Sequence, residues 1–393
     1  MRKYFLIFFS ILSVLFSQEL QIEIENLKSN NALKKALSAY RLRNFKCEIR
    51  ESIPYLLDIL DDETVIADKN LGKTTPSEES KKTLLKIGPD ILPYIFEKLN
   101  DPEVSKKKKL KMIELVDEMN DKNGIKTLEN LINTEDSEIR EKALMILAKH
   151  EDEIDFLINF VKNQDDNTKI KIIIYFGQNK IKKSLPYLYE CLKDKNWEIR
   201  KYAIWSIGEI KENVDVEKLI PLVNDKNNFV RKEIAETFGK IKNPRTISCL
   251  IELLNDSNWY VKIASIKSAC EFNNVRFFEP ILNLIYDKQI EVKLEAIKAL
   301  AVFKDKRATL PLISNLNDRY HLLIREYSAY ALGEIRDKRA IYSLINLLKS
   351  ENYELKKIAR ESLKKITGID LGYDIEKWYN WAGQNKISSI KEN

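Results

Sequence analysis

The sequence is poor in residues that break helices and in residues that build metal or catalytic sites. Its 393 residues include 10 glycines, 10 prolines, 4 cysteines and 2 histidines, while 32% are charged. So few glycines and prolines are typical of an all-helical chain and give a sheet little support. The cysteines form no CxxC pair and have no metal-ligand spacing. The two histidines are far apart in sequence, which leaves no recognisable zinc or nucleophile arrangement.

The chain also lacks a marked excess of charge of one sign. Its net charge is +6, with both signs interspersed, which argues against a dedicated nucleic-acid binder. Arg2 and Lys3 precede an uncharged apolar stretch from Tyr4 to Phe16 that is short for a bilayer span. We predict a signal peptide over residues 1–17, export to the periplasm or the medium, and a mature chain without a membrane span. The alternative is an uncleaved membrane anchor, because Leu15 is large for its place before the cut.

A 31-residue repeat organises the second half of the chain. Aspartates recur at this spacing, and a basic residue follows each one six positions later, with one extra residue inserted near His321. The series comprises Asp194, Asp225, Asp256, Asp287 and Asp318, with Arg200, Arg231, Lys262, Lys293 and Arg325. Self-similarity at a fixed period indicates stacked two-helix repeats. We interpret the two series as a structural ladder of charge-assisted hydrogen bonds between neighbouring units.

The second helix of each unit has the periodicity of a buried helix face. Apolar or small residues stand just before the basic residue and three, four, seven and ten positions after it, as in Ile199, Ala203, Ile204, Ile207 and Ile210. Cys191 and Cys249 fall on apolar positions of first helices, and Cys270 takes a position that other repeats fill with glycine. We therefore predict buried free thiols, although export would permit disulfides.

These residues carry a resemblance to a known family. The pattern Asp194-x-x-Trp197-x-Ile199-Arg200-x-x-Ala203-x-x-x-Ile207-Gly208-x-Ile210 resembles the HEAT-repeat family, specifically its short phycobilisome-lyase-like (PBS lyase) subtype. The resemblance implies an all-α fold, a right-handed α-solenoid of stacked antiparallel two-helix repeats. Its motif specifies a fold far more than a function.

Two enzyme groups share such repeats, the phycobilin lyases and deoxyhypusine hydroxylase. The hydroxylase holds two irons with several His-Glu dipeptides. This sequence has one, His150-Glu151, and its other histidine, His321, is followed by Leu322. A di-iron centre of that kind is therefore excluded, and we interpret His150 as a helix-end residue favoured by the helix dipole.

The expected organisation has five segments. They are a signal peptide (1–17), a polar N-terminal leading helix (18–45), irregular HEAT-like repeats (46–183), regular 31-residue HEAT-like repeats (184–370) and a C-terminal cap (371–393). The leading helix carries an amphipathic run that begins at Leu33, and the stretch from Asp61 to Thr74 is expected to be irregular. Gly88 should end the helix that follows. Trp378 and Trp381 on one face of the cap should cover the apolar side of the last repeat.

The candidate site follows from helix geometry. Positions one, five and nine after each basic residue point away from the predicted core, and in this family they line the concave surface. Apolar residues occupy some of these positions, where polar ones are expected: Trp205, Ile263, Leu294, Val302 and Tyr330. Lysines occupy others: Lys201, Lys232, Lys267 and Lys298. A contiguous exposed apolar patch rimmed by charge marks an interaction surface, although single exposed apolar residues are ordinary.

The sequence therefore predicts an exported, non-enzymatic HEAT-repeat scaffold that binds an unidentified protein or peptide through its concave face. It predicts no catalytic residues, cofactor, metal or nucleic-acid partner. One alternative is an enzyme or chromophore-handling protein of the phycobilin-lyase kind, which rests on the repeat resemblance alone. Another is a structural part of an envelope assembly, which differs only in having a permanent partner.

Overall fold

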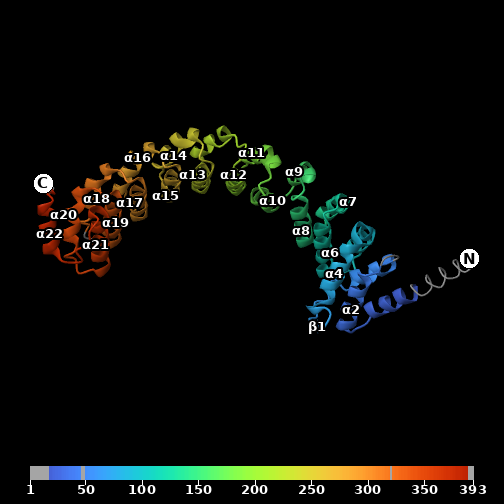
Figure 1. The fold of residues 1–393 in the computed structure, drawn as a ribbon. Helices are drawn as coiled ribbons and strands as arrows, with labels where there is room; N and C mark the ends of the chain where they lie inside the picture. The colour runs from blue at the N-terminus through green and yellow to red at the C-terminus, as the bar shows by residue number, and fades with distance from the viewer. Residues whose placement is uncertain (1–16, 46–48, 319–320, 388–393) are drawn as a thin grey trace, which may run out of the picture. The chain divides into compact units, whose positions relative to one another are not determined.

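The computed structural model describes residues 17–45, 49–318 and 321–387 (Figure 1). The predicted signal peptide, apart from Ser17, lies outside the described residues, and so does Cys47. The chain divides into two compact units, residues 1–163 and 164–393. Each unit has its own helical core.

The first unit consists of short helices and one small hairpin. Residues 17–27 form its first described helix. The elements that follow are α2 (Ala32–Leu42), η1 (Ile49–Ser52), α3 (Ile53–Asp58), β1 (Ile66–Asp68), β2 (Gly72–Thr74), α4 (Pro76–Ile87), η2 (Gly88–Ile91), α5 (Leu92–Asn100), α6 (Lys106–Met119), α7 (Lys122–Thr127), η3 (Leu128–Asn133), α8 (Ser137–Leu147), η4 (Glu151–Glu153) and α9 (Ile154–Val161).

Helix α2 buries a different face from the predicted one. Ala36, Ala39 and Leu42 are fully buried, whereas Leu33 is 36% exposed. The prediction of a stripe beginning at Leu33 was wrong because it counted large apolar residues and passed over the alanines. Small side chains allow α2 to pack closely against α4.

The stretch expected to be irregular, from Asp61 to Thr74, contains the antiparallel β-hairpin β1–β2. Its turn is closed by Asp68, whose carboxylate accepts a hydrogen bond from the amide of Asn70 at 2.8 Å. Gly72 follows with φ of 70°, a conformation that glycine adopts without strain. Asp and Asn followed by such a glycine are hairpin signals, which the prediction missed.

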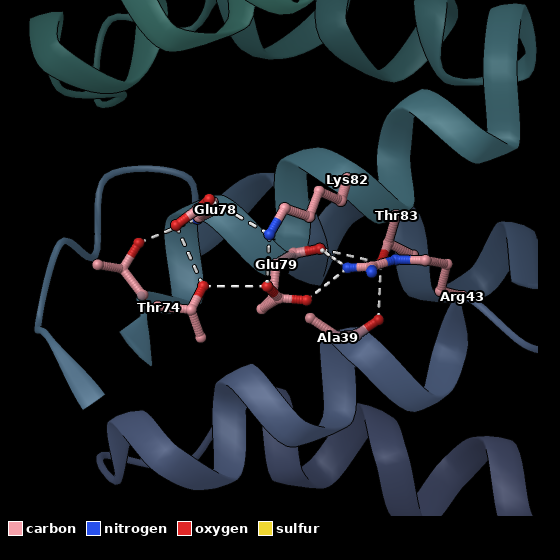
Figure 2. Close-up of polar contacts among 8 residues, drawn as sticks. Ala39, Arg43, Thr74, Glu78, Glu79, Lys82 and Thr83 are labelled. Carbon is pink, nitrogen blue, oxygen red and sulfur yellow. Dashed lines mark hydrogen bonds and ion pairs between the residues drawn. The ribbon is translucent and has the colours of Figure 1, made fainter. Parts of the chain in front are cut away.

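A buried charge cluster around Glu79 joins α2 to α4 (Figure 2). Glu79 accepts hydrogen bonds from Lys82 at 2.9 Å, from Arg43 at 2.6 Å and from the Thr74 hydroxyl at 3.0 Å. Burial by itself would raise the pKa of Glu79, but these hydrogen bonds outweigh it and lower the pKa. Both carboxylate oxygens of Glu79 accept hydrogen bonds, so we interpret the cluster as a structural contact between α2 and α4.

The second unit is a regular stack of helices. Its elements are α10 (Asp166–Gln178), η5 (Lys182–Ser184), α11 (Leu185–Cys191), α12 (Trp197–Ile210), η6 (Val216–Lys218), η7 (Ile220–Asn224), α13 (Asn228–Ile241), η8 (Pro244–Thr246), α14 (Ile247–Leu253), α15 (Trp259–Phe272), η9 (Val275–Phe277), α16 (Phe278–Asn283), η10 (Leu284–Tyr286), α17 (Ile290–Phe303), η11 (Lys306–Ala308), α18 (Thr309–Asn315), α19 (Leu322–Ile335), η12 (Lys338–Ala340), α20 (Ile341–Leu347), α21 (Tyr353–Thr367) and α22 (Ile375–Gln384).

Each repeat of this unit pairs a short first helix with a longer second helix. In Figure 1 the second helices α12, α13, α15, α17, α19 and α21 follow the inner side of the unit, and α11, α14, α16, α18 and α20 follow the outer side. The predicted core positions of α12, from Ile199 to Ile210, are at most 3% exposed. The structure thus confirms the predicted all-α solenoid of stacked two-helix repeats.

Neighbouring second helices approach closely where a glycine faces a hydroxyl residue. Ser268 on α15 donates its hydroxyl to the carbonyl of Ala235 on α13 at 2.7 Å. A Cβ added at Gly239 would lie 2.6 Å from the same hydroxyl oxygen, so only glycine allows this approach. Equivalent hydroxyl-to-carbonyl bonds join α10 to α12, α12 to α13 and α19 to α21, through Ser206, Thr237 and Ser362.

This packing pattern begins before the 31-residue repeats and is interrupted at two junctions within them. It already includes α10, which lies before the expected start of the regular repeats at residue 184. Two junctions, α15–α17 and α17–α19, lack it, because alanine replaces the hydroxyl residue at Ala299 and Ala331. Cys270 and Ala301 hold the corresponding glycine positions there.

The C-terminal cap buries one tryptophan and packs a second against its ring. Trp378 of α22 is fully buried and donates its indole N–H to the carbonyl of Gly372 at 3.0 Å. The Trp381 ring meets it edge-on, with centroids 6.3 Å apart. The Tyr379 hydroxyl bonds the Asn346 side chain of α20 at 2.6 Å. Helix α22 therefore covers α20, the first helix of the last repeat.

Candidate partner-binding face

The turn before each second helix is built by two side chains of the repeat. In one turn the Asp225 carboxylate accepts a hydrogen bond from the amide of Asn227, at 2.8 Å. The Asn227 side chain then caps α13 by accepting from the amide of Phe229, also at 2.8 Å. Asp194 with Asn196 and Asp256 with Asn258 repeat this arrangement. The regular Asp spacing therefore fixes where each second helix begins.

The basic residue of one repeat reaches the aspartate of the next. Arg200 donates two hydrogen bonds to Asp225, at 2.7 and 2.8 Å, and one to the carbonyl of Asp194 at 2.8 Å. Arg231 binds Asp256 in the same forked geometry, at 2.6 and 2.9 Å. Lys262 makes a single contact with Asp287 at 2.6 Å. These pairs are largely shielded from water, which strengthens them relative to surface ion pairs.

The ladder changes toward the C-terminus. Arg325 donates to the carbonyl of Leu316 at 3.1 Å, and Ser350 stands where the next aspartate would be. Asp318 accepts a hydrogen bond from the amide of His321 at 2.9 Å. Burial by itself would raise the pKa of Asp287. Hydrogen bonds from Lys262 and the Gln289 amide outweigh it, and the nearby charge of Lys293 also helps to lower the pKa.

The predicted apolar positions all reach the surface of the second helices to some degree. Val302 is 54% exposed and Tyr330 is 44% exposed. Trp205, Ile263 and Leu294 are half-buried. Neighbouring helices α15, α17 and α19 supply four of the five residues, and Figure 1 places these helices on the inner side of the unit.

The lysines predicted on this face differ in their surroundings. Lys232 pairs with Glu236 at 2.7 Å, and Lys298 lies 3.5 Å from Glu295. The Lys201 ammonium lies 4.5 Å from the centroid of the Tyr202 ring. Lys267 is exposed.

Ion pairs also run across the repeats at the position nine residues after the ladder residue. Lys240 of α13 pairs with Glu209 of α12 at 2.8 Å, and its ammonium lies 5.8 Å from the Trp205 ring centroid. Lys365 of α21 pairs with Glu334 of α19 at 2.6 Å. Acidic and basic groups therefore alternate along this part of the face.

A second row of basic residues was missed by the sequence prediction. Each second helix ends at a residue in left-handed conformation, with φ of 55° at Lys242 and 54° at Lys304. Lys242 pairs with Glu271 at 3.0 Å, so this row borders the predicted face. The 31-residue spacing offered the signal, since the row comprises Lys180, Lys211, Lys242, Lys304 and Arg336, with the uncharged Asn273 at the one interrupting position.

A hollow of about 390 Å³ lies on this face, between the C-terminal halves of α13 and α15. Its lining combines small residues with charged ones, namely Lys211, Glu236, Gly239, Lys240, Lys242, Ala264, Lys267, Ser268 and Glu271. Gly239 lies against Ser268 at the floor of the hollow, and Ala264 adds only a short side chain there. The hollow and the apolar residues thus belong to one continuous stretch of second helices.

Glu233 of α13 was also missed. The residue is 6% exposed, and its Oε1 atom has no hydrogen-bond partner within the described part of the chain. Burial, followed by the nearby Glu236 carboxylate, raises the pKa of Glu233 to about 7. The helical pattern could not reveal it, because a glutamate two positions after the ladder residue looks like an ordinary solvated side chain.

The metal-ligating, histidine and cysteine side chains bear on whether the chain could hold a catalytic group. No group of three or more His, Cys, Asp or Glu residues among them is arranged to hold a metal ion. Burial lowers the pKa of His150, which disfavours the protonated ring that the helix-dipole interpretation requires. The cysteines that the structure describes, Cys191, Cys249 and Cys270, are free, and burial raises the thiol pKa of Cys191 and Cys270 to about 11. Within the described ranges, no helix combines the length and hydrophobicity of a bilayer span.

Solved structures with a similar fold include karyopherins. The karyopherin Kap121p bound to the extreme C-terminus of the protein phosphatase Cdc14p matches with a TM-score of 0.60 and 12% identity, over 88% of this chain and 45% of that one. Kap121p bound to Nup53p matches with a TM-score of 0.60 and 12% identity, over 93% of this chain and 47% of that one. The chain thus spans about half the length of these karyopherins, and at this identity the likeness concerns the fold alone.

The comparison with curated proteins yields no match. The family model for HEAT repeats matches residues 154–236, 215–270 and 278–364, which together make up just over half of the chain. These matches coincide with the stacked helix pairs and the Asp-to-Arg ladder described above. The chain therefore belongs to the HEAT-repeat family and is a helical repeat scaffold.

Proposed function

We propose that this protein is an exported, non-enzymatic scaffold that binds a protein or peptide partner through the inner face of its second helices. The observation that carries the proposal is the row of apolar side chains Trp205, Ile263, Leu294, Val302 and Tyr330 on that face. Folding alone gives no reason for apolar residues at exposed positions, and such patches are typical of partner sites. The similar karyopherin structures, one bound to the extreme C-terminus of Cdc14p and the other to Nup53p, support a protein partner.

The test compares two faces of the same repeats. The Val302→Ser, Tyr330→Ser variant should leave the melting temperature nearly unchanged, because exposed substitutions usually alter stability by about 0.5 kcal/mol or less. It should weaken partner binding by about 2 kcal/mol. The matched control replaces Val275 and Leu310, which are 68% and 46% exposed on η9 and α18, with serine.

The partner would be isolated by affinity chromatography of the mature chain against an extract of its own cell envelope, with mass spectrometry to identify it. A protein retained by the wild type and the control variant, but lost with the face variant, supports the proposal. Equal retention by all three would rule out this face. A second variant, Ile263→Ser with Leu294→Ser, samples the half-buried part of the row, and a large drop in its melting temperature would mark those residues as core.

Export is proposed from the N-terminal residues. The basic pair Arg2 and Lys3, followed by the apolar stretch from Tyr4 to Phe16, is typical of a signal peptide. The mature protein is expected to begin at about Gln18. N-terminal sequencing of the native protein tests this, and Met1 on a cytosolic protein would contradict it.

We also infer that the repeats are of the short PBS-lyase-like subtype, because of their 31-residue period and the Asp-x-x-Trp start at Asp194. This subtype does not by itself imply enzyme activity. A bound chromophore, detected as visible absorbance of protein purified from its source, would contradict the non-enzymatic proposal.

A further inference from the structure

The hollow between α13 and α15 has an unbalanced charge. Four of its lining residues are lysines and two are glutamates. Glu271 pairs with Lys242 at 3.0 Å. Glu236 pairs outside the lining, with Lys232 at 2.7 Å.

Two of the four lysines in the hollow form no ion pair with a described acidic residue. Lys240 pairs outside the hollow, with Glu209 at 2.8 Å. Within the described chain, Lys211 and Lys267 have no acidic partner, and both are exposed. They come from different repeats, the end of α12 and the middle of α15. The hollow therefore presents two ammonium groups without compensating charge, which favours an anionic group of a ligand.

The hollow has room for more than a small ion. Its volume of about 390 Å³ lies in the range of pockets that hold small ligands or side chains, about 300 to 1,000 Å³. Gly239 and Ala264 contribute almost no side-chain bulk to its walls. A hollow of this size holds a carboxylate side chain.

Apolar side chains flank the hollow on the same face. Ile263 lies one helical turn before Lys267 on α15, and Leu294 follows on the next second helix. On the other side, Trp205 lies beside the Lys240 ammonium. A ligand that reaches the two free ammonium groups would therefore meet apolar contacts on both sides.

A protein segment fits these surroundings better than a nucleic acid. A polynucleotide carries a phosphate at every residue, whereas the face outside the hollow alternates in sign, with Glu209 and Glu334 among its lysines. A polypeptide can place one carboxylate at the hollow and apolar side chains beside it. The charge pattern thus selects a single acidic residue in an apolar context.

We propose that the hollow between α13 and α15 binds an acidic side chain of an extended protein segment, with apolar residues of that segment on either side of it. Lys211 and Lys267 bind the carboxylate, and Trp205, Ile263 and Leu294 contact the flanking residues. The proposal rests on the proposed function and specifies which chemistry the partner presents.

The experiment uses phage-displayed random peptides selected on the mature wild-type protein. Enriched peptides should contain Asp or Glu between apolar residues. The leading peptide is then synthesised with a fluorophore, and its Kd is measured by anisotropy. Lys211→Glu with Lys267→Glu should weaken binding at least about tenfold, as should replacing the peptide's acidic residue with its amide. Affinity should also fall as salt is raised.

The matched control reverses two other exposed lysines, Lys306→Glu with Lys338→Glu, in η11 and η12, which precede α18 and α20. It changes the net charge equally and should leave the Kd unchanged. Lys211→Gln with Lys267→Gln, a milder change, covers the case in which the reversed variant does not fold. Thermal melts show which variants are folded.

The outcomes separate this inference from the proposed function. If Ile263→Ser with Leu294→Ser abolishes peptide binding while the lysine variants leave it intact, the face binds peptides and the acidic site is wrong. Enrichment of peptides without acidic residues would likewise show that the acidic site is wrong. If no peptide is enriched, or if neither the lysine variants nor the apolar ones affect binding, both proposals fail. Complete competition by inorganic phosphate, or by a short single-stranded DNA, would assign the hollow to free anions or to nucleic acid instead.

Discussion

Glu233 shows how one residue can make stability depend on pH. Its ordinary pKa of 4.5 is raised to about 7, mainly by burial. The folded state therefore holds the proton more tightly than the unfolded state. The stability that this provides is fully present below about pH 4.5 and is lost as the pH rises through 7.

We therefore predict that Glu233→Gln stabilises the protein at pH 8 by roughly 3 kcal/mol relative to wild type, since a pKa shift of this size corresponds to that free energy. Near pH 4 the two proteins should differ little, because a protonated carboxyl and an amide are similar in shape and charge. Urea unfolding of both proteins across this pH range measures the difference. A difference that does not vary with pH would contradict the buried carboxyl.

Arg231 shows what the forked ladder contributes. Its guanidinium is held by Asp256 in the next repeat and by a backbone carbonyl of its own turn. Arg231→Ala should cost about 1 to 3 kcal/mol of unfolding free energy, because Asp256 keeps its buried charge and loses its charged donor. The matched variant is Arg325→Ala, whose wild-type side chain bonds a carbonyl, and it should cost less. Equal melting temperatures for wild type and Arg231→Ala would show that the ladder adds no stability.

At the scale of elements, the spacing between second helices depends on the glycine that faces a hydroxyl. A Cβ added at Gly333 on α19 would lie 2.6 Å from the Ser362 hydroxyl oxygen and 2.9 Å from its Cα atom. The backbone contact cannot be relieved by rotating a side chain, so α19 and α21 must move apart. This separation also strains the bond from Ser362 to the carbonyl of Ala329.

Gly333→Ala is therefore expected to destabilise the protein by about 1 to 2 kcal/mol, even though alanine is intrinsically favoured over glycine in a helix by roughly 1 kcal/mol. The control is Gly383→Ala in α22, where an added Cβ has nothing within 4 Å, and it should be neutral or stabilising. Chemical denaturation compares the two. The same sign for both variants would mean that the close approach does not limit the packing.

At the scale of the whole molecule, stability in a repeat array is local. Each repeat contacts its neighbours, so a defect at one end need not unfold the rest. Trp378→Ala removes a fully buried ring from the cap. It should lower the unfolding free energy of the C-terminal helices by about 3 to 5 kcal/mol. Hydrogen exchange should then accelerate in α20, α21 and α22 and remain nearly unchanged in α12 and α13. Uniform acceleration from α10 to α22 would indicate a fully cooperative second unit.

The repeat spacing and the helix phase could be predicted from the sequence because they depend on periodic residue types. The buried stripe from Ile199 to Ile210 and the helix that stops at Gly88 follow local rules of periodicity and capping. The hairpin before α4 was missed because its strands are three residues long and carry no clear alternation. The buried face of α2 was missed because alanines look neutral to a hydrophobicity count.

The candidate site was less accessible to prediction. Sequence phase could place Val302 and Tyr330 on the surface, but it could not tell which lysines already have partners. That distinction depends on contacts between repeats, such as Lys240 with Glu209, which no local pattern encodes. The hollow has the same origin, since its lining residues come from the end of α12 and from α13 and α15.

The two junctions without a hydroxyl bond give the second unit an uneven stiffness. A hydroxyl that donates to a neighbouring helix resists sliding and splaying, whereas the alanines at Ala299 and Ala331 rest on dispersion forces alone. Bending of the array should therefore concentrate at α15–α17 and α17–α19. These are the helices that carry Ile263, Leu294, Val302 and Tyr330. The apolar part of the predicted face thus lies on the section of the second unit that should bend most easily, so the width of the face should vary most there.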